Sequence, residues 1–353
     1  MKRISIKHCA LCIVHCALCI ILLACGNVKK TATYPTVKIE PVGPAFNADS
    51  AYLFCQEQCN FGPRTMNSEA HERCGTWIAD KFRSYGMEVT LQQANLRGYD
   101  GTKLKSTNII ASYRPELTDR IMLCAHWDSR PWADNDPDEA NHHKPVMAAN
   151  DGASGVAVML EIARLLNGLQ LTADSLQQAA DSLQLKTPGI DFVCFDAEDW
   201  GTPQWAEDRG SNTDTWALGA QHWAEQFKLQ TSTAKPRFGI LLDMVGGEGA
   251  RFYQEQVSLA YASEVVGKVW AAAETVGFGS YFPKDVGSGI TDDHLPVNRV
   301  ARIPCIDIIP YYPDCDASSF GPTWHTVNDD MNHIDKNTLQ AVGQTLIQVL
   351  FSE

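Results

Sequence analysis

Imidazole and carboxylate side chains follow three short apolar runs of this sequence. The runs cover residues 119–125, 190–196 and 238–242, and the polar residues that follow them are His126, Asp128, Glu198, Asp199 and Asp243. Asp151 and His325 lie in turn-rich sequence elsewhere in the chain. Because ligands of open α/β sheets bind in the crevice at the carboxyl ends of the strands, we expect these side chains to converge at one edge of a sheet.

This set of residues has the composition of a catalytic zinc site. Zinc accepts histidine nitrogen together with carboxylate oxygen, and a catalytic site keeps one coordination position open for substrate or water. The adjacent Glu198 and Asp199 are the most informative pair, since one carboxylate can bind metal while its neighbour transfers a proton. A single aspartate after a strand is more often a turn or helix cap, and two adjacent acids can form a solvated turn. The prediction therefore depends on the joint pattern.

Strands and helices alternate along the chain. Hydrophobic periodicity and turn residues predict strands over 87–95, 107–113, 119–125, 190–196, 238–244 and 303–309, and helices over 46–60, 67–85, 153–167, 214–228, 258–276 and 335–351. This alternation predicts an α/β sandwich. Residues 168–187 are interpreted as an extra amphipathic helix pair or surface excursion, and the long aperiodic segment 128–150 is predicted to be a functional or mobile loop.

The N-terminus has the pattern of an export signal. Lys2 and Arg3 precede an apolar stretch that ends in Leu-Leu-Ala-Cys at Cys25. This pattern resembles a bacterial lipoprotein signal, with residues 1–24 as signal peptide, Cys25 as the lipidated residue, 25–44 as a tether and 45–353 as a single catalytic domain. We therefore expect an exported protein, anchored to the bacterial membrane by lipid and facing the periplasm. The alternative is a plain transmembrane anchor, but two histidines interrupt the apolar stretch.

Charge and cysteine content narrow the class of protein further. The net charge of -13 and the lack of a basic run argue against a nucleic-acid partner. Export allows disulfides, and the candidates among the seven cysteines after Cys25 are Cys55, Cys59, Cys74, Cys305 and Cys315. Cys124 and Cys194 lie inside apolar runs and are predicted to be core thiols.

Six motifs in order resemble the glutaminyl cyclases, which share the fold of the zinc aminopeptidases. They are HWDSR at 126, NDGASGVAVMLEIAR at 150, DAEDWG at 196, LLDMVG at 241, TDDHLP at 291 and WHTVNDD at 324. The resemblance covers roughly residues 45–351. It implies a three-layer α/β/α sandwich of the zinc-aminopeptidase type, with a central mixed, mostly parallel β-sheet and one catalytic zinc ion per chain.

The resemblance also implies roles for individual residues. The zinc ligands would be Asp151, Asp199 and His325, the acid/base would be Glu198, and Asp243 and Asp292 would form a hydrogen-bonded carboxylate pair. The substrate pocket would be lined by Trp324, Trp200, Trp205 and Asp307. Asp199 and Asp307 depart from the animal enzymes, which have glutamate and histidine at these positions.

The expected activity is conversion of the N-terminal glutamine of peptides and proteins to pyroglutamate, with release of ammonia. The main alternative is a two-zinc aminopeptidase, in which His126 and Asp243 would bind a second metal ion beside the ligands already named. Asp292 and the order Trp324-His325 favour the cyclase, because Asp292 gives Asp243 a partner other than metal. A third alternative is a lipoprotein that uses this fold only for binding.

Overall fold

Six strands form one mixed sheet, with the order β1-β2-β4-β3-β5-β6. The computed structural model describes residues 40–175, 187–206, 215–230 and 234–353. The strands are β1 (Glu88–Arg97), β2 (Lys103–Tyr113), β3 (Arg120–His126), β4 (Gly189–Phe195), β5 (Gly239–Leu242) and β6 (Cys305–Ile308). Strand β2 is antiparallel to both β1 and β4, whereas β4, β3, β5 and β6 are parallel to one another. The predicted mixed, mostly parallel sheet is confirmed.

The parallel strands bring the predicted polar residues to one edge of the sheet. Leu123 of β3 pairs with Phe192 of β4 and with Ile240 of β5, so the three strands are aligned. His126 is the last residue of β3, and the turns that carry Glu198 and Asp243 begin where β4 and β5 end. Parallel neighbours end on the same side, and convergence follows from this topology.

The two faces of the sheet contact different hydrophobic cores. Ile121 and Leu123 of β3 belong to one core, and the alternating residues Met122 and Cys124 belong to the other. Every residue of β3 is buried. A strand covered on both faces needs apolar residues at every position, which explains why the sequence shows a continuous run rather than an alternation.

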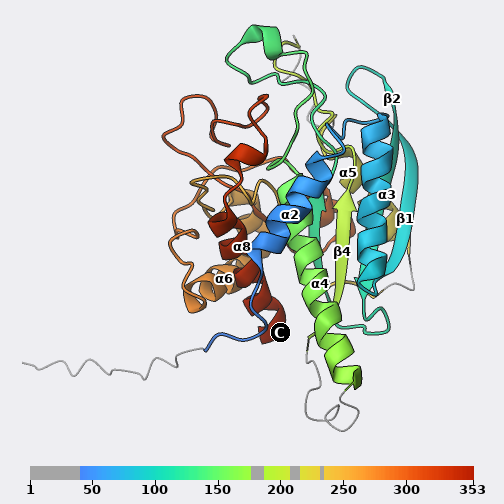
Figure 1. Ribbon diagram of the computed structural model, residues 1–353, viewed down its shortest axis with the longest axis vertical. Helices are drawn as coiled ribbons and strands as arrows, with labels where there is room; N and C mark the ends of the chain where they lie inside the picture. Colours follow the sequence, from blue (N-terminus) through green and yellow to red (C-terminus); the bar gives the residue numbers. More distant parts are fainter. Residues whose placement is uncertain (1–39, 176–186, 207–214, 231–233) are drawn as a thin grey trace, which may run out of the picture. The chain divides into compact units, whose positions relative to one another are not determined.

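Helices cover both faces and complete the three layers. One face packs against α2 (Ala48–Cys59), α3 (Glu69–Ser84), α4 (Ala153–Ser175), α6 (Gln256–Thr275) and α8 (Lys336–Ser352). The other packs against α5 (Leu218–Leu229) and the short helical segments α7 (His294–Pro296) and η3 (Val297–Ala301). Helix α2 lies beside α4 and α8 in front of the sheet (Figure 1). The predicted three-layer sandwich is confirmed.

The predicted starts of three helices agree with the observed ones, because a polar capping residue precedes each helix. Asn47, Ser68 and Asp335 each accept a hydrogen bond from a backbone N–H in the first turn of α2, α3 and α8. Such caps satisfy amides that have no partner within the helix. The predicted starts at 46, 67 and 335 therefore lie within two residues of the observed ones.

Two predictions about local structure are corrected. Helix α4 continues without a break to Ser175, so the first part of 168–187 extends α4 rather than forming a separate helix pair. Residues 176–186 lie outside the described part. None of the disulfide candidates is paired: Cys55, Cys59, Cys74, Cys305 and Cys315 are free thiols, and the first four are buried as small core residues. Cys124 and Cys194 are buried in the core, as predicted.

Residues Glu40–Glu353 form one compact unit. The predicted signal peptide, Cys25 and most of the tether lie outside the described residues. Within the part of the chain that is described, no helix has the length and apolar character needed to cross a bilayer.

Candidate metal centre and active site

Asp151, Asp199 and His325, here called the His325 trio, converge at the sheet edge. One ligand atom from each lies within 4.8 Å of the other two. His325 Nε2 lies 3.3 Å from Asp199 Oδ1 and 3.7 Å from Asp151 Oδ2, and all three side chains are buried. Both carboxylate oxygens of Asp199 lack a hydrogen-bond partner among the described residues. Asp199 Oδ1 faces His325 Nε2 and, at 3.6 Å, Arg130 Nη1, but neither contact is a hydrogen bond. Because a buried carboxylate without hydrogen bonds is costly, this mixed nitrogen and oxygen set fits a divalent cation such as zinc.

Two further buried carboxylates hold the loops that carry these ligands. Asp128 accepts the backbone N–H groups of Glu198 at 3.0 Å and Asp199 at 3.2 Å. Asp329 accepts the N–H of Asp151 at 3.1 Å and that of the preceding residue at 2.8 Å. Each carboxylate thereby fixes the backbone of one ligand-bearing turn. Asp329 lies within a motif of the predicted site, but its role was not predicted.

His325 is supported on its other ring nitrogen. Nδ1 lies 3.3 Å from Asp134 Oδ1, and Arg130 donates two hydrogen bonds to the same carboxylate at 2.7 and 3.0 Å. Burial alone would raise the pKa of Asp134, but the hydrogen bonds from His325 and Arg130 hold it well below its ordinary value. A carboxylate at the outer nitrogen fixes the orientation of a metal-binding histidine. Asp134 belongs to the aperiodic segment 128–150, whose predicted functional role gave the only sequence signal for it.

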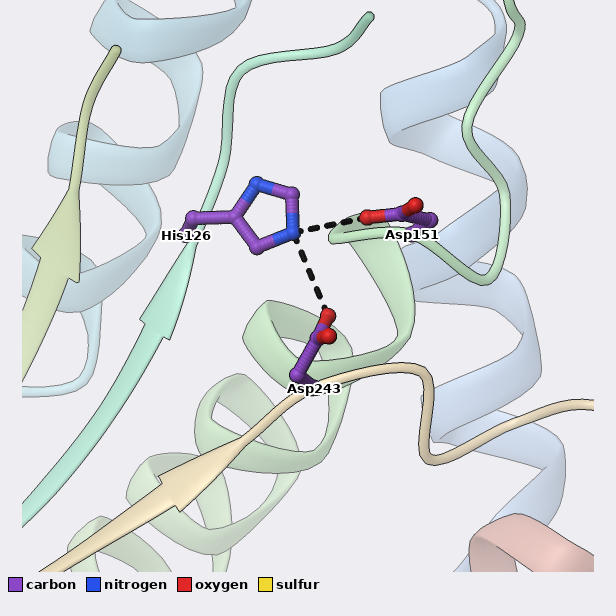
Figure 2. Close-up of side chains that lie close together, drawn as sticks. All are labelled: His126, Asp151 and Asp243. Atoms are coloured by element: carbon purple, nitrogen blue, oxygen red, sulfur yellow. Dashed lines mark hydrogen bonds and ion pairs between the residues drawn. The ribbon is translucent and has the colours of Figure 1, made fainter. Parts of the chain in front are cut away.

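His126, Asp151 and Asp243, here called the His126 trio, form a second group that shares Asp151. Figure 2 shows the imidazole at the end of β3 pointing between the two carboxylates. His126 Nε2 lies 2.9 Å from Asp151 Oδ1 and 3.2 Å from Asp243 Oδ1. These contacts already satisfy the ring nitrogen that faces the carboxylates. His126 was predicted to be a support residue or a second-metal ligand, and the geometry places it where either role is available.

Glu198 belongs to neither trio but lines the same cavity as Asp151 and His325. Burial raises the pKa of Glu198 well above its ordinary value; positively charged His126 opposes the shift, and the negative charges of Asp199 and Asp292 add to it. A carboxyl group with a raised pKa binds a proton more readily than an ordinary glutamate does, which favours proton transfer. Glu198 therefore has the environment of an acid/base group.

The cavity has a volume of about 320 Å³ and is lined by both acidic and aromatic residues. Its ionisable lining consists of Asp151, Glu198, Asp243, Asp292 and His325. Trp324 lines it as predicted and stacks on His325, with ring centres 3.8 Å apart. Trp216 and Phe320 also line it and were not predicted. Pockets with an apolar wall and a few convergent polar groups are typical ligand sites.

Trp200 and Trp205 are not among the residues that line this cavity, which corrects their predicted role. Both contact Trp132 instead, with ring centres 5.3 and 5.9 Å apart. The side chain of Trp205 is 42% exposed. The two residues follow the catalytic turn closely in sequence, but their side chains pack against the 128–150 loop rather than into the cavity.

Two further predictions are corrected. Asp307 does not line the cavity: it pairs with Leu241 across β5 and β6 and therefore points to the same face as Leu241. Its carboxylate lies 3.9 Å from His294 Nδ1 under the sheet. Asp243 and Asp292 both line the cavity, but the described structure contains no hydrogen bond between them. Asp243 contacts His126 instead.

Comparison with known proteins identifies the family. The model of peptidase family M28 matches residues 108–350, which is more than half of the chain. The chain belongs to peptidase family M28. This M28 chain is also similar to the solved structure of Bacteroides thetaiotaomicron glutaminyl cyclase bound to N-acetylhistamine, with 50% identity and a TM-score of 0.80, covering 88% of this chain and 100% of that one.

The chain is also similar to a second glutaminyl cyclase and to an aminopeptidase. The solved structure of Tannerella forsythia glutaminyl cyclase is 47% identical to the M28 chain, with a TM-score of 0.80, and the match covers 88% of the M28 chain and 100% of the cyclase. Aminopeptidase YwaD of Bacillus subtilis is 26% identical over 300 residues, which are 82% of this chain and 54% of that protein. The chain therefore spans about half the length of this curated relative. The predicted resemblance to glutaminyl cyclases is confirmed.

Proposed function

We propose that this M28 protein is a zinc-dependent glutaminyl-peptide cyclotransferase. It would convert the N-terminal glutamine of peptides and proteins to pyroglutamate and release ammonia. The observation that carries the proposal is the position of Glu198: a buried carboxyl group, not needed as a metal ligand, lies in one small cavity with Asp151 and His325 of the His325 trio. The similarity to two solved glutaminyl cyclases supports the same reaction.

The residues of the chain provide the proton transfers of this reaction. A single zinc ion bound by Asp151, Asp199 and His325 would polarise the side-chain carbonyl of the substrate glutamine as a Lewis acid. Glu198 takes a proton from the substrate's α-amino group, whose nitrogen forms a bond to the side-chain carbonyl carbon. The bond from that carbon to the amide nitrogen breaks, and Glu198 returns the proton to the departing nitrogen, which leaves as ammonia. No outside nucleophile is consumed.

Asp243 and Asp292 lie where they can bind the carboxamide that leaves. Burial, followed by the charge of Asp151, raises the pKa of Asp243 to about 8, so this carboxyl group is largely protonated at neutral pH and can donate a hydrogen bond. Burial also raises the pKa of Asp292. Trp324 and Trp216 cover the apolar side of the cavity and exclude water from the reacting groups.

A two-zinc aminopeptidase remains the second candidate, because Asp151 belongs to both trios and could bridge two ions. The hydrogen bonding of the candidate ligand atoms supports a single ion. His126 is already hydrogen-bonded to Asp243, whereas the oxygens of Asp199 have no such partner in the described part.

One experiment separates the two candidates. The purified full chain is tested for zinc content, for ammonia release from a Gln-initiated peptide, and for hydrolysis of a leucine anilide. The proposal expects one zinc ion per chain and ammonia release that stops on chelation and returns with zinc. Two ions with anilide hydrolysis and no ammonia would establish the aminopeptidase instead.

The variant Glu198→Gln tests the acid/base role. It preserves size but cannot accept a proton, so kcat for cyclisation should fall by about 10²–10⁴-fold while zinc content stays the same. Steady-state kinetics and metal analysis of the same preparation provide the measurement. An unchanged kcat would contradict the role assigned to Glu198.

We also propose that the chain is exported and anchored to the bacterial membrane through lipid on Cys25, facing the periplasm. The charged start, apolar stretch and Cys25 of the sequence support this. Cys25→Ala should abolish incorporation of labelled fatty acid and release the protein from the membrane fraction. Continued labelling of the variant would contradict lipidation at Cys25.

A further inference from the structure

A second hollow adjoins the active-site cavity. It has a volume of about 360 Å³, and Trp216, Thr291 and Asp292 line both spaces. These three residues are therefore the wall between the two. A molecule bound in the cavity therefore lies next to the second hollow.

The second hollow differs in chemistry from the active-site cavity. Its apolar lining consists of Ala217, Leu295, Pro296 and Val300. Arg299 is the only cation among the described residues that line it. The exposed Arg299 donates to the hydroxyl of Tyr261 at 3.3 Å and forms no ion pair within the described structure, so its charge is available to a ligand.

The active-site cavity is too small to hold a whole peptide. Its volume of about 320 Å³ is at the lower end of the range of roughly 300–1,000 Å³ found for ligand pockets. Cyclisation requires both the α-amino group and the side chain of the first residue to face Glu198. The carbonyl group of that residue must then direct the remaining peptide out of the cavity.

We propose that the second hollow binds the residues that follow the N-terminal glutamine, and that Arg299 selects substrates with an acidic side chain at the second or third position. This inference rests on the proposed function. No lysine or arginine is among the described residues that line the active-site cavity. Arg299 therefore provides the cation that an acidic side chain can pair with beyond the cavity, and the apolar lining contacts the backbone and the other side chains.

The test uses a set of matched peptides. Gln-Glu-Ala, Gln-Ala-Glu, Gln-Ala-Ala and Gln-Lys-Ala amides are compared by ammonia release, and kcat/KM is measured for the wild type, Arg299→Gln and Arg299→Glu. Arg73→Gln is the control, because Arg73 is an arginine on α3 that lines neither space. All variants are used as the zinc-loaded full chain.

The quantity to compare is the ratio of kcat/KM for acidic over neutral peptide. The wild type and Arg73→Gln should prefer the better acidic peptide by about two- to fivefold, the range of an exposed ion pair, and the preference should shrink at high salt. Arg299→Gln should abolish it, and Arg299→Glu should reverse it in favour of Gln-Lys-Ala. Equal ratios in all four proteins would overturn the proposal. Absence of ammonia from every peptide would instead contradict the proposed function.

A second variant tests the hollow independently of charge. Val300→Trp fills the space, whereas Val286→Trp places the same side chain at an exposed residue that lines neither space. If the hollow binds the peptide, Val300→Trp should raise KM for a Gln-initiated pentapeptide relative to glutamine amide, which does not reach past Trp216. Val286→Trp should keep the wild-type ratio. The same ratio in both variants would show that the peptide leaves by another route.

Discussion

The two trios that share Asp151 differ in how their ligand atoms are satisfied. In the His126 trio, one ring nitrogen lies 2.9 Å from Asp151 and 3.2 Å from Asp243, so the imidazole joins both carboxylates (Figure 2). In the His325 trio, the oxygens of Asp199 make no hydrogen bond to any described residue. A hydrogen bond joins His126 to Asp243, whereas the members of the His325 trio are joined only by longer ion pairs of 3.3 and 3.7 Å.

This difference supports the His325 trio as the proposed metal site. A cation entering the His126 trio would displace the hydrogen bond between His126 and Asp243, whereas a cation entering the His325 trio would meet oxygens of Asp199 that make no hydrogen bond to a described residue. The groups behind the histidines differ as well. Behind His325, Asp134 contacts both the imidazole and Arg130, and Arg130 lies 3.6 Å from Asp199. The outer nitrogen of His126 lies 3.6 Å from Asp128. In the proposed one-zinc site, His126 is a countercharge for Asp151 and a hydrogen-bond partner of Asp243.

The largest expected effect is loss of a ligand from the His325 trio. Asp199→Asn should weaken zinc binding by more than about 100-fold and reduce cyclisation with it, since losing a ligand exceeds the 10–100-fold cost of losing an outer partner. The matched change Asp243→Asn in the other trio should leave one zinc ion per chain. Zinc titration against a competing chelator measures both. Equal weakening in the two variants would show that both trios bind metal.

A smaller effect is expected from the carboxylate behind His325. Asp134→Asn should weaken zinc binding by about 10–100-fold, because the ring loses the partner that fixes its orientation. Asp138→Asn is the control, since it makes the same change in the same loop at an exposed cap of a short helix. The same chelator titration applies. If both variants bind zinc like the wild type, Asp134 does not orient the ligand.

The smallest effect concerns stability and pH in the His126 trio. Burial, followed by the charge of Asp151, raises the pKa of Asp243 from the unfolded value of 3.8 to about 8. The folded protein binds this proton more tightly than the unfolded protein does. The protonated Asp243 therefore adds to the free energy of unfolding, fully below pH 3.8, and this contribution is lost as the pH rises through about 8.

Asp243→Asn cannot lose this proton. Between about pH 6 and about pH 9, the metal-free variant should therefore lose less unfolding free energy than the metal-free wild type, by on the order of 1 kcal/mol. Urea unfolding of chelator-treated protein across this range provides the measurement. Parallel pH dependences of the two proteins would mean that Asp243 is ionised throughout.

Much of the fold followed from local patterns. The predicted strand 119–125 is β3, Arg120–His126, and residues 121–125 are all apolar because the strand is covered on both faces. The convergence of His126, Glu198 and Asp243 followed from strand ends that share one edge. The wrong predictions concern the directions of side chains close to these strand ends. Trp200 and Trp205 have residue types suited to a pocket, but the direction of each side chain depends on a loop path that residue type does not encode.

The sequence by itself determined the strands, the helices and the set of ligand types, because these depend on periodicity, caps and the chemistry of single residues. Only the tertiary structure decided how the set divides into two trios and which atoms remain unpaired. Asp329 holds the backbone of Asp151 from a distance of 178 residues along the chain, and Trp216 enters the cavity from another loop. Such contacts depend on the relative position of distant segments, and that position is set by packing of the whole sheet rather than by any local pattern.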